Sequence, residues 1–276
     1  MQPTIKEHFD FDHVPFRKTI ADESLWLPGS KKATVETMTR ALKLRQNAVL
    51  TGEPGVGKTC VLRAVRHRLA DTDLRLTYVH NATLSRRDFY RELCVALDLE
   101  AAATVGALFH AVSTHIEKVG RDQFHPVILI DEAHLLREET LEHLHILLNY
   151  NFDSEPLMSL VLIGLPQLAD TLKLRRHRSL YSRIRHRIEL EPMEPADTAD
   201  YIQFRLEEAG FTGEIFARDA IELIHEASYG RPREIDRICQ TALEVAAGND
   251  RSLIERELVG QVLEAQSMHQ QLGGGS

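Results

Sequence analysis

The residues best suited to chemistry lie in one glycine-rich stretch, Gly52-Glu53-Pro54-Gly55-Val56-Gly57-Lys58-Thr59. This stretch matches G-x-x-x-x-G-K-[ST], the phosphate-binding P-loop. Its glycines let backbone N–H groups turn towards a polyphosphate, and the N-terminus of a following helix adds its positive end. We expect Lys58 to contact the β- and γ-phosphates of ATP and the Thr59 hydroxyl to bind Mg²⁺. The binding stretch is expected to extend to Cys60.

Two adjacent carboxylates, Asp131 and Glu132, directly follow the apolar run 126–130. A strand buried on both faces has such a continuous apolar sequence, and its carboxyl end opens onto the ligand crevice of an α/β sheet. An acidic turn after a core strand would mean little alone, but with a P-loop upstream it forms the Walker B pattern. We expect Asp131 to hold Mg²⁺, and Glu132 to orient and deprotonate the attacking water.

The elements around these motifs are expected to alternate between strands and helices. Short apolar runs predict strands at 47–51, 74–80, 126–130, 158–164 and 188–190. Helical periodicity, with a turn at 81–84 and Ser85 as an N-cap, predicts helices at 31–45, 60–69, 85–97, 104–119 and 138–150. This alternation is typical of a parallel sheet covered on both faces. The expected fold class is therefore α/β, with a five-stranded parallel sheet sandwiched by helices.

A second, smaller domain is expected after a hinge marked by Pro192 and Pro195. No strand pattern follows the hinge, and helices are predicted near 195–209, 217–228, 231–247 and 255–267. The expected domains are an α/β nucleotide-binding domain at 1–191, including an aromatic lead-in, and an all-helical lid at 192–267. The lead-in aromatics would either flank the adenine or anchor the segment. Residues 268–276 end in a linker-like Gly-Gly-Gly-Ser tail.

Composition limits the class of protein. The chain has 276 residues, 43% hydrophobic and 27% charged, which is ordinary for a globular protein. It has no apolar run of about 18 residues and no signal-peptide core. The three separated cysteines are typical of a reducing compartment, so we expect a cytoplasmic protein that does not enter a membrane. Because the net charge is −8, nucleic-acid binding would require a local basic patch.

Two arginine-bearing stretches are candidates for contacts with phosphate groups, either of a nucleotide or of DNA. Residues 173–187 contain six arginines, which would serve as fingers on a neighbouring subunit's nucleotide, as contacts to DNA phosphates, or as a solvated helix face. Arg183 and Arg185 are our candidates for the finger. Arg86 and Arg87 follow the second strand, where they would touch a DNA backbone or simply begin a solvated helix.

Together these motifs resemble the AAA+ ATPases, and most closely the ExeA-like group, which includes the transposition regulators TnsC, TniB and MuB and the related IstB. The resemblance covers nearly the whole chain and rests on the two Walker motifs, the arginine stretch, the lead-in at 8–16 and the Gly-x-Pro-Arg motif at 230–233. It implies that Arg233 is the lid arginine called sensor 2, and that Arg183 or Arg185 is the finger. It also implies that Arg86 and Arg87 face DNA. The chain departs from the group at Leu165, where a polar sensor 1 residue usually stands, and Gln167 is the nearest replacement.

The resemblance implies a regulatory ATPase of DNA transposition. Its ATP-bound copies would form a ring or filament on duplex DNA without reading sequence, recruit a transposase, with or without a targeting adaptor, and leave on hydrolysis. The alternative is an ExeA-type ATPase of secretion or the cell envelope, which acts on a protein partner without DNA. A third possibility is a stand-alone nucleotide-dependent switch in defence or signalling.

Overall fold

The computed structural model describes residues 4–17, 22, 25–80, 85–149 and 156–273, with side chains to residue 266. Its contacts divide the chain into two compact units. The first, the helical unit, comprises Met1–Pro28, Gly55–Gly57 and Glu191–Ser276, and the second, the α/β unit, comprises Gly29–Pro54 and Lys58–Leu190. Each unit has its own cluster of buried apolar side chains. The expected turn at 81–84 lies outside the described residues.

The α/β unit is built on a five-stranded parallel sheet in the order β2-β3-β4-β1-β5. Its strands are β1 (Asn47–Thr51), β2 (Leu74–Val79), β3 (His125–Ile130), β4 (Ser159–Gly164) and β5 (Ile184–Glu189). Every residue of β3 and β4 is buried, which accounts for their continuous apolar sequences. This confirms the predicted α/β fold with a five-stranded parallel sheet.

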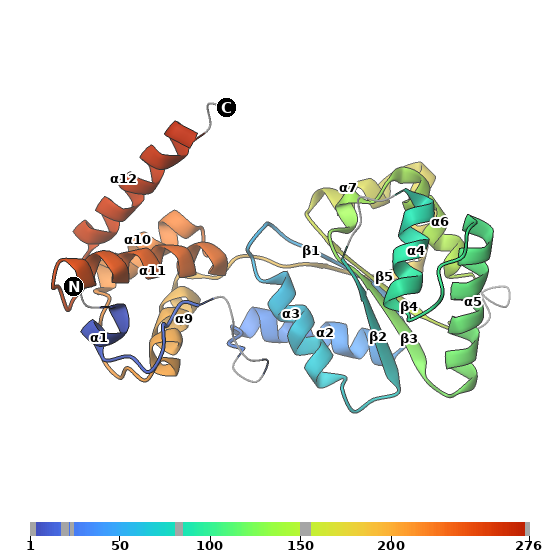
Figure 1. Ribbon diagram of the computed structural model, residues 1–276, viewed down its shortest axis with the longest axis horizontal. Coiled ribbons are helices and arrows are strands. Elements are labelled where there is room, and N and C mark those ends of the chain that lie inside the picture. The colour runs from blue at the N-terminus through green and yellow to red at the C-terminus, as the bar shows by residue number, and fades with distance from the viewer. Residues whose placement is uncertain (1–3, 18–21, 23–24, 81–84, 150–155, 274–276) are drawn as a thin grey trace. The chain divides into compact units, whose positions relative to one another are not determined.

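Helices cover both faces of the sheet (Figure 1). On one face lie α2 (Gly29–Lys43) and α3 (Lys58–Arg68), and on the other lie α4 (Arg86–Ala96), α5 (Val105–Arg121), α6 (Glu138–Leu147) and α7 (Gln167–Lys173). Ser85 caps α4 as predicted, because its hydroxyl accepts a hydrogen bond from Asp88 N–H. A single-turn 3-10 helix, η1 (Ala133–Leu135), follows the Walker B carboxylates.

The segment before the last strand differs from the expectation. The 3-10 helix η3 (Arg175–His177) and α8 (Arg178–Arg183) were not predicted, and β5 begins four residues earlier than the expected 188. The reason is that β5 is an edge strand with alternating exposure, and arginines occupy its exposed positions Arg185 and Arg187. The apolar-run criterion does not recognise a strand of that composition.

The helical unit contains α1 (Ile5–Phe9), α9 (Pro195–Glu208), α10 (Arg218–Ser228), α11 (Pro232–Gly248) and α12 (Arg256–Gly273). The four later helices match those expected for a lid. The lead-in, however, groups with these helices and not with the sheet. Its side chains Phe9, Phe11 and Phe16 are at most 5% exposed and belong to the apolar core of the helical unit. These buried rings anchor the lead-in to the helical unit, which is a sufficient reason for its aromatic residues.

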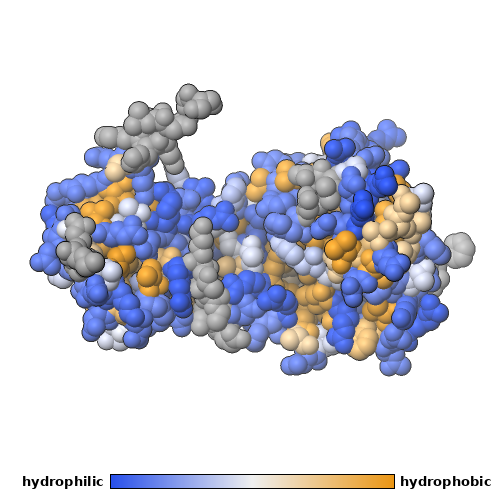
Figure 2. Space-filling view, in the orientation of Figure 1, coloured by the Kyte–Doolittle hydropathy of each residue, from blue (hydrophilic) through white to orange (hydrophobic). Residues whose placement is uncertain are grey.

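The surface of both units is mainly hydrophilic in the face shown, with apolar side chains in small groups (Figure 2). Among the described residues, no helix combines the length and the apolar character needed to cross a bilayer.

Candidate functional site

The P-loop connects β1 to α3. Two of its glycines, Gly55 and Gly57, have φ angles of 79° and 104°, a region in which side chains are strained, so the loop needs glycine at both positions. The Lys58 ammonium group donates hydrogen bonds to the backbone oxygens of Gly52 at 2.7 Å and Glu53 at 3.1 Å. The loop is therefore folded around its own lysine.

The other residues of the predicted binding stretch differ in how far they are exposed to solvent. Val56 is fully buried and Cys60 half-buried, whereas Glu53 and Pro54 are exposed. Thr59 is exposed in the first turn of α3.

The carboxylate of Asp131 is held by two donors directly after β3. Tyr78 on β2 donates its hydroxyl to Asp131 Oδ2 at 2.5 Å, and Glu132 N–H donates to Asp131 Oδ1 at 2.9 Å. Burial, followed by the hydrogen bond to Asp131, raises the pKa of Tyr78, so its phenol remains a donor. Asp131 is only 7% exposed. An oriented carboxylate and the Thr59 hydroxyl at the carboxyl edge of one sheet are hard oxygen ligands, and they fit Mg²⁺.

Sequence reasoning missed two side chains at this edge, Tyr78 and His134. Glu132 has a positive φ of 51°, and its Oε2 lies 3.4 Å from Nδ1 of His134. The signal for His134 is its three-residue spacing from Asp131, which places it on the turn after the strand. Tyr78 pairs with Leu129 of β3 in the sheet, and no motif in the sequence marks this pairing.

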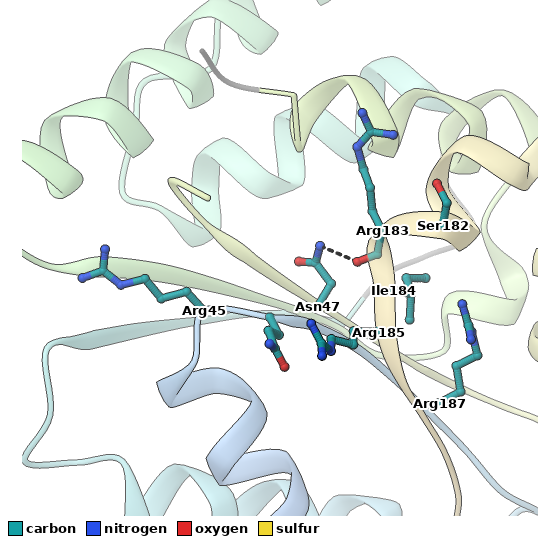
Figure 3. A pocket seen from close by; sticks show the side chains of 8 residues that line it. Arg45, Asn47, Ser182, Arg183, Ile184, Arg185 and Arg187 are labelled. Carbon is teal, nitrogen blue, oxygen red and sulfur yellow. Dashed lines mark hydrogen bonds between the residues drawn. The ribbon is translucent and has the colours of Figure 1, made fainter. Parts of the chain in front are cut away.

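A basic cavity of about 550 Å³ lies at the opposite edge of the sheet, where β1 and β5 begin (Figure 3). Its charged lining is entirely arginine, from Arg45, Arg183, Arg185 and Arg187, and it is completed by Gln46, Asn47, Ser182 and Ile184. In Figure 3 the guanidinium groups point in different directions from the strand ends. The structure thus gathers the two predicted finger residues with two further arginines on one basic surface.

Asn47 fixes the position of the finger candidates, a role that sequence reasoning also missed. Its Nδ2 donates to the backbone oxygen of Arg183 at 3.0 Å, and its Oδ1 accepts from Leu160 N–H at 2.8 Å. One amide therefore joins the starts of β1, β4 and β5. The Arg183 guanidinium donates back to Ser179 O at 3.0 Å, and Arg185 is exposed.

The two DNA-contact candidates differ in their surroundings. Arg87 is exposed at the start of α4. Arg86 is half-buried, its backbone N–H donates to Glu139 Oε1 at 3.3 Å, and its charge helps burial to lower the pKa of His143. Arg86 therefore faces protein, and Arg87 is the better candidate for contact with a polyanion.

The predicted sensor 2 residue, Arg233, is exposed in the first turn of α11. The glycine of its motif is structurally required, since Gly230 has a φ of 64° and a Cβ there would lie 2.1 Å from Met193 O. Met193 N–H also donates to Gly230 O at 2.8 Å. The motif thus fixes the start of α11 within the helical unit.

Comparison with known proteins agrees with this fold. Residues 40–172 match the family described as the AAA domain. The chain is 36% identical over 200 residues to general secretion pathway protein A of Aeromonas hydrophila, covering 72% of this chain and 36% of that protein. It therefore spans about a third of the length of that relative.

Solved structures share the fold at low identity. The Orc1 protein of Aeropyrum pernix, solved in complex with DNA, has a TM-score of 0.68 and 20% identity, covering 92% of this chain and 69% of that one. The RuvB Holliday junction branch migration motor of Thermotoga maritima has a TM-score of 0.59 and 20% identity, covering 91% and 73%. The chain thus carries an AAA domain, a P-loop ATPase domain, within an AAA+ fold.

Proposed function

We propose that this protein hydrolyses ATP between neighbouring copies of itself and that its ATP-bound assembly binds duplex DNA as a regulator of transposition. One observation supports the first part. Arg183 and Arg185 lie where β5 begins, whereas the P-loop follows the end of β1, which runs parallel to β5. A five-residue strand spans about 16 Å, so an arginine at its start does not reach the nucleotide at its end, and the proposed target of the finger is a neighbour's nucleotide.

The site residues then take the roles that their chemistry allows. Lys58 and the loop N–H groups bind the phosphates, while Thr59 and Asp131 hold Mg²⁺, which supplies charge neutralisation at the transferred phosphate. Tyr78 keeps Asp131 oriented. Glu132 takes the proton of the attacking water. The neighbour's arginine completes the site, so hydrolysis depends on assembly.

DNA binding is proposed for the exposed Arg87 and its counterparts on successive copies. With a net charge of −8, the chain attracts DNA only through local basic side chains, and repetition of one arginine contact along an assembly adds up. Such binding is salt-dependent and indifferent to sequence. The similar Orc1 structure was solved with DNA, which supports this choice. Recruitment of a transposase, with or without a targeting adaptor, rests on the resemblance to transposition regulators.

A second candidate function is favoured by the 36% identical relative, whose name places it in the general secretion pathway. In that case the same ATP-driven assembly acts on a protein partner without DNA. The ATP site and the finger retain their roles, and only the ligand of the assembly differs.

The finger is tested by mixing two inactive variants. Lys58→Ala retains the arginines but cannot bind ATP, and Arg183→Ala binds ATP but lacks the finger. An equal mixture should regain hydrolysis, because an ATP-loaded Arg183→Ala copy meets the intact arginine of a Lys58→Ala copy. If the mixture stays inactive while Arg183→Ala alone is also inactive, the finger does not act between copies. The same mixture with Arg185→Ala decides between the two arginines.

DNA binding is tested by fluorescence anisotropy of a labelled random duplex, with and without a slowly hydrolysed ATP analogue. We expect binding that requires the nucleotide, weakens with salt, and falls in Arg87→Ala. Arg218→Ala is the matched control, since Arg218 is exposed on α10 of the helical unit. Absence of binding at low salt in either state would support the protein-partner function instead.

A further inference from the structure

His134 lies two residues after Glu132, in the single turn of η1. Its side chain is 14% exposed and packs against the end of β4. A Cβ added to Gly164 would be 3.1 Å from His134 N and 3.2 Å from His134 Nδ1. These distances are shorter than ordinary van der Waals contact, so the glycine at the end of β4 leaves the room that the imidazole occupies.

Nδ1 of His134 has two polar neighbours. Leu165 N–H donates to it at 3.4 Å, and Oε2 of Glu132 also lies 3.4 Å away. To accept from Leu165, Nδ1 must present its lone pair, but to bind the carboxylate it must carry a proton. A neutral imidazole satisfies only one of these partners at a time, with its single proton on Nε2 in the first case and on Nδ1 in the second.

The end of β4 is itself joined to the P-loop. Thr51 pairs with Gly164 in the sheet, and Gly52 N–H, at the first P-loop residue, donates to Gly164 O at 3.2 Å. The next residue, Leu165, has an apolar side chain, so its backbone N–H is the group that can make a polar contact there. A continuous path of contacts therefore runs from the first P-loop residue through Gly164 and Leu165 to His134 and Glu132.

From this geometry we propose that His134 is a positioning residue that couples the P-loop to Glu132 through alternative contacts of Nδ1. When Nδ1 accepts from Leu165 N–H, the Glu132 carboxylate is free to turn towards water. When Nδ1 carries the proton, it holds that carboxylate back. The inference rests on the proposed role of Glu132 as the base.

Three substitutions of His134 separate this role from simple packing. His134→Asn places an amide atom at the position of Nδ1, and His134→Gln places one at the position of Nε2. His134→Ala removes both. We expect kcat for ATP to fall by about 10- to 100-fold in the Ala and Gln variants, the scale of a misplaced catalytic group. His134→Asn should recover at least half of the decrease in the logarithm of kcat. KM should stay within about twofold, because the proposed role of His134 is exerted on the Glu132 carboxylate and not on the phosphates.

The measurement is steady-state hydrolysis by the full chain, with and without duplex DNA, together with binding of a fluorescent ATP analogue to show that each variant is folded. The proposal is overturned if His134→Ala retains normal kcat, if Asn rescues no better than Gln, or if KM rises while kcat is unchanged. Where His134→Ala fails to bind the analogue, the comparison of Asn with Gln decides alone.

A double variant distinguishes failure of this inference from failure of its premise. If Glu132→Gln still turns over normally, Glu132 is not the base and the proposed function must change. If Glu132→Gln is impaired, His134 acts through Glu132 only when adding His134→Ala costs no further activity. An additional tenfold loss in the double variant would show that His134 acts elsewhere.

Discussion

Arg205→Met should strongly destabilise the helical unit. Arg205 on α9 is 2% exposed, and its guanidinium donates to Pro15 O at 2.6 and 2.9 Å and to Arg17 O at 2.9 Å. It also donates to Tyr201 Oη at 2.6 Å and to Asp236 Oδ1 at 3.2 Å. One side chain therefore joins the lead-in to α9 and α11. Methionine keeps the apolar stem but leaves the carboxylate of Asp236, which is 25% exposed, and two backbone carbonyls without this partner.

The expected loss of unfolding free energy follows from the carboxylate charge that remains when Arg205 is removed. Breaking a buried ion pair by removing one partner costs about 3–5 kcal/mol, because the other charge stays buried and uncompensated. That charge is Asp236, whose pKa burial raises to about 6 against the opposing effect of Arg205. A carboxyl whose pKa is raised in the folded state stabilises that state when protonated, and this contribution is lost as pH rises through the folded pKa. The cost of Arg205→Met should thus be greatest above pH 6 and shrink towards pH 4.

The chain supplies its own probe for this experiment. Its single tryptophan, Trp26, lies in the same unit with its ring centroid 5.5 Å from that of Tyr201. Urea unfolding followed by tryptophan fluorescence at pH 8 and pH 5 gives the loss at each pH. Arg218→Met is the control, because Arg218 is 95% exposed, and its midpoint should not change. A loss below about 1 kcal/mol, or an equal loss at both pH values, would refute the assigned role of the buried pair.

Three further outcomes are expected. Lys58→Ala should abolish ATP binding and ATP-dependent assembly, and oligomers that persist with ATP in size-exclusion chromatography would contradict the P-loop assignment. Glu132→Gln should lower hydrolysis by about 10²- to 10⁴-fold while ATP and DNA remain bound, as seen by anisotropy, because only the proton acceptor is lost. His125 is 1% exposed, and burial lowers its pKa to about 4, so the α/β unit should lose up to about 3 kcal/mol as pH falls from 6.5 to 4. His125→Gln should flatten that dependence in unfolding followed by circular dichroism, and an unchanged slope would assign it to other groups.

The sheet could be predicted from sequence because most of its strands are buried on both faces. Continuous apolar runs located β1, β3 and β4, and the two Walker motifs marked the edge at which their carboxyl ends meet. The edge strand β5 was located only in part, because after the buried Ile184 its exposed positions alternate with half-buried ones. Edge strands have one unpaired side, and their composition is set by solvent or partners more than by the core.

Motifs also could not reveal the residues that hold functional groups in place. Asn47 matters because its amide reaches Arg183 and Leu160, which are more than one hundred residues away in sequence. Tyr78 matters because the register of β2 on β3 brings its hydroxyl to Asp131. Such contacts depend on strand order and register, which a single sequence specifies only through the complete fold.

The P-loop lies where β1 ends, and the arginine surface lies where β1 and β5 begin. This arrangement explains why ATP binding and assembly of copies should depend on each other. Each copy carries a net charge of −8, so copies repel one another, and the arginine surface where β1 and β5 begin is a local exception. A neighbour's ATP would bring polyphosphate charge to that surface, which favours association. Hydrolysis and release of phosphate remove part of that charge, while the repulsion between copies remains. In the proposed assembly, ATP turnover weakens the contact between copies on which turnover depends, so the copies associate with ATP and separate after hydrolysis.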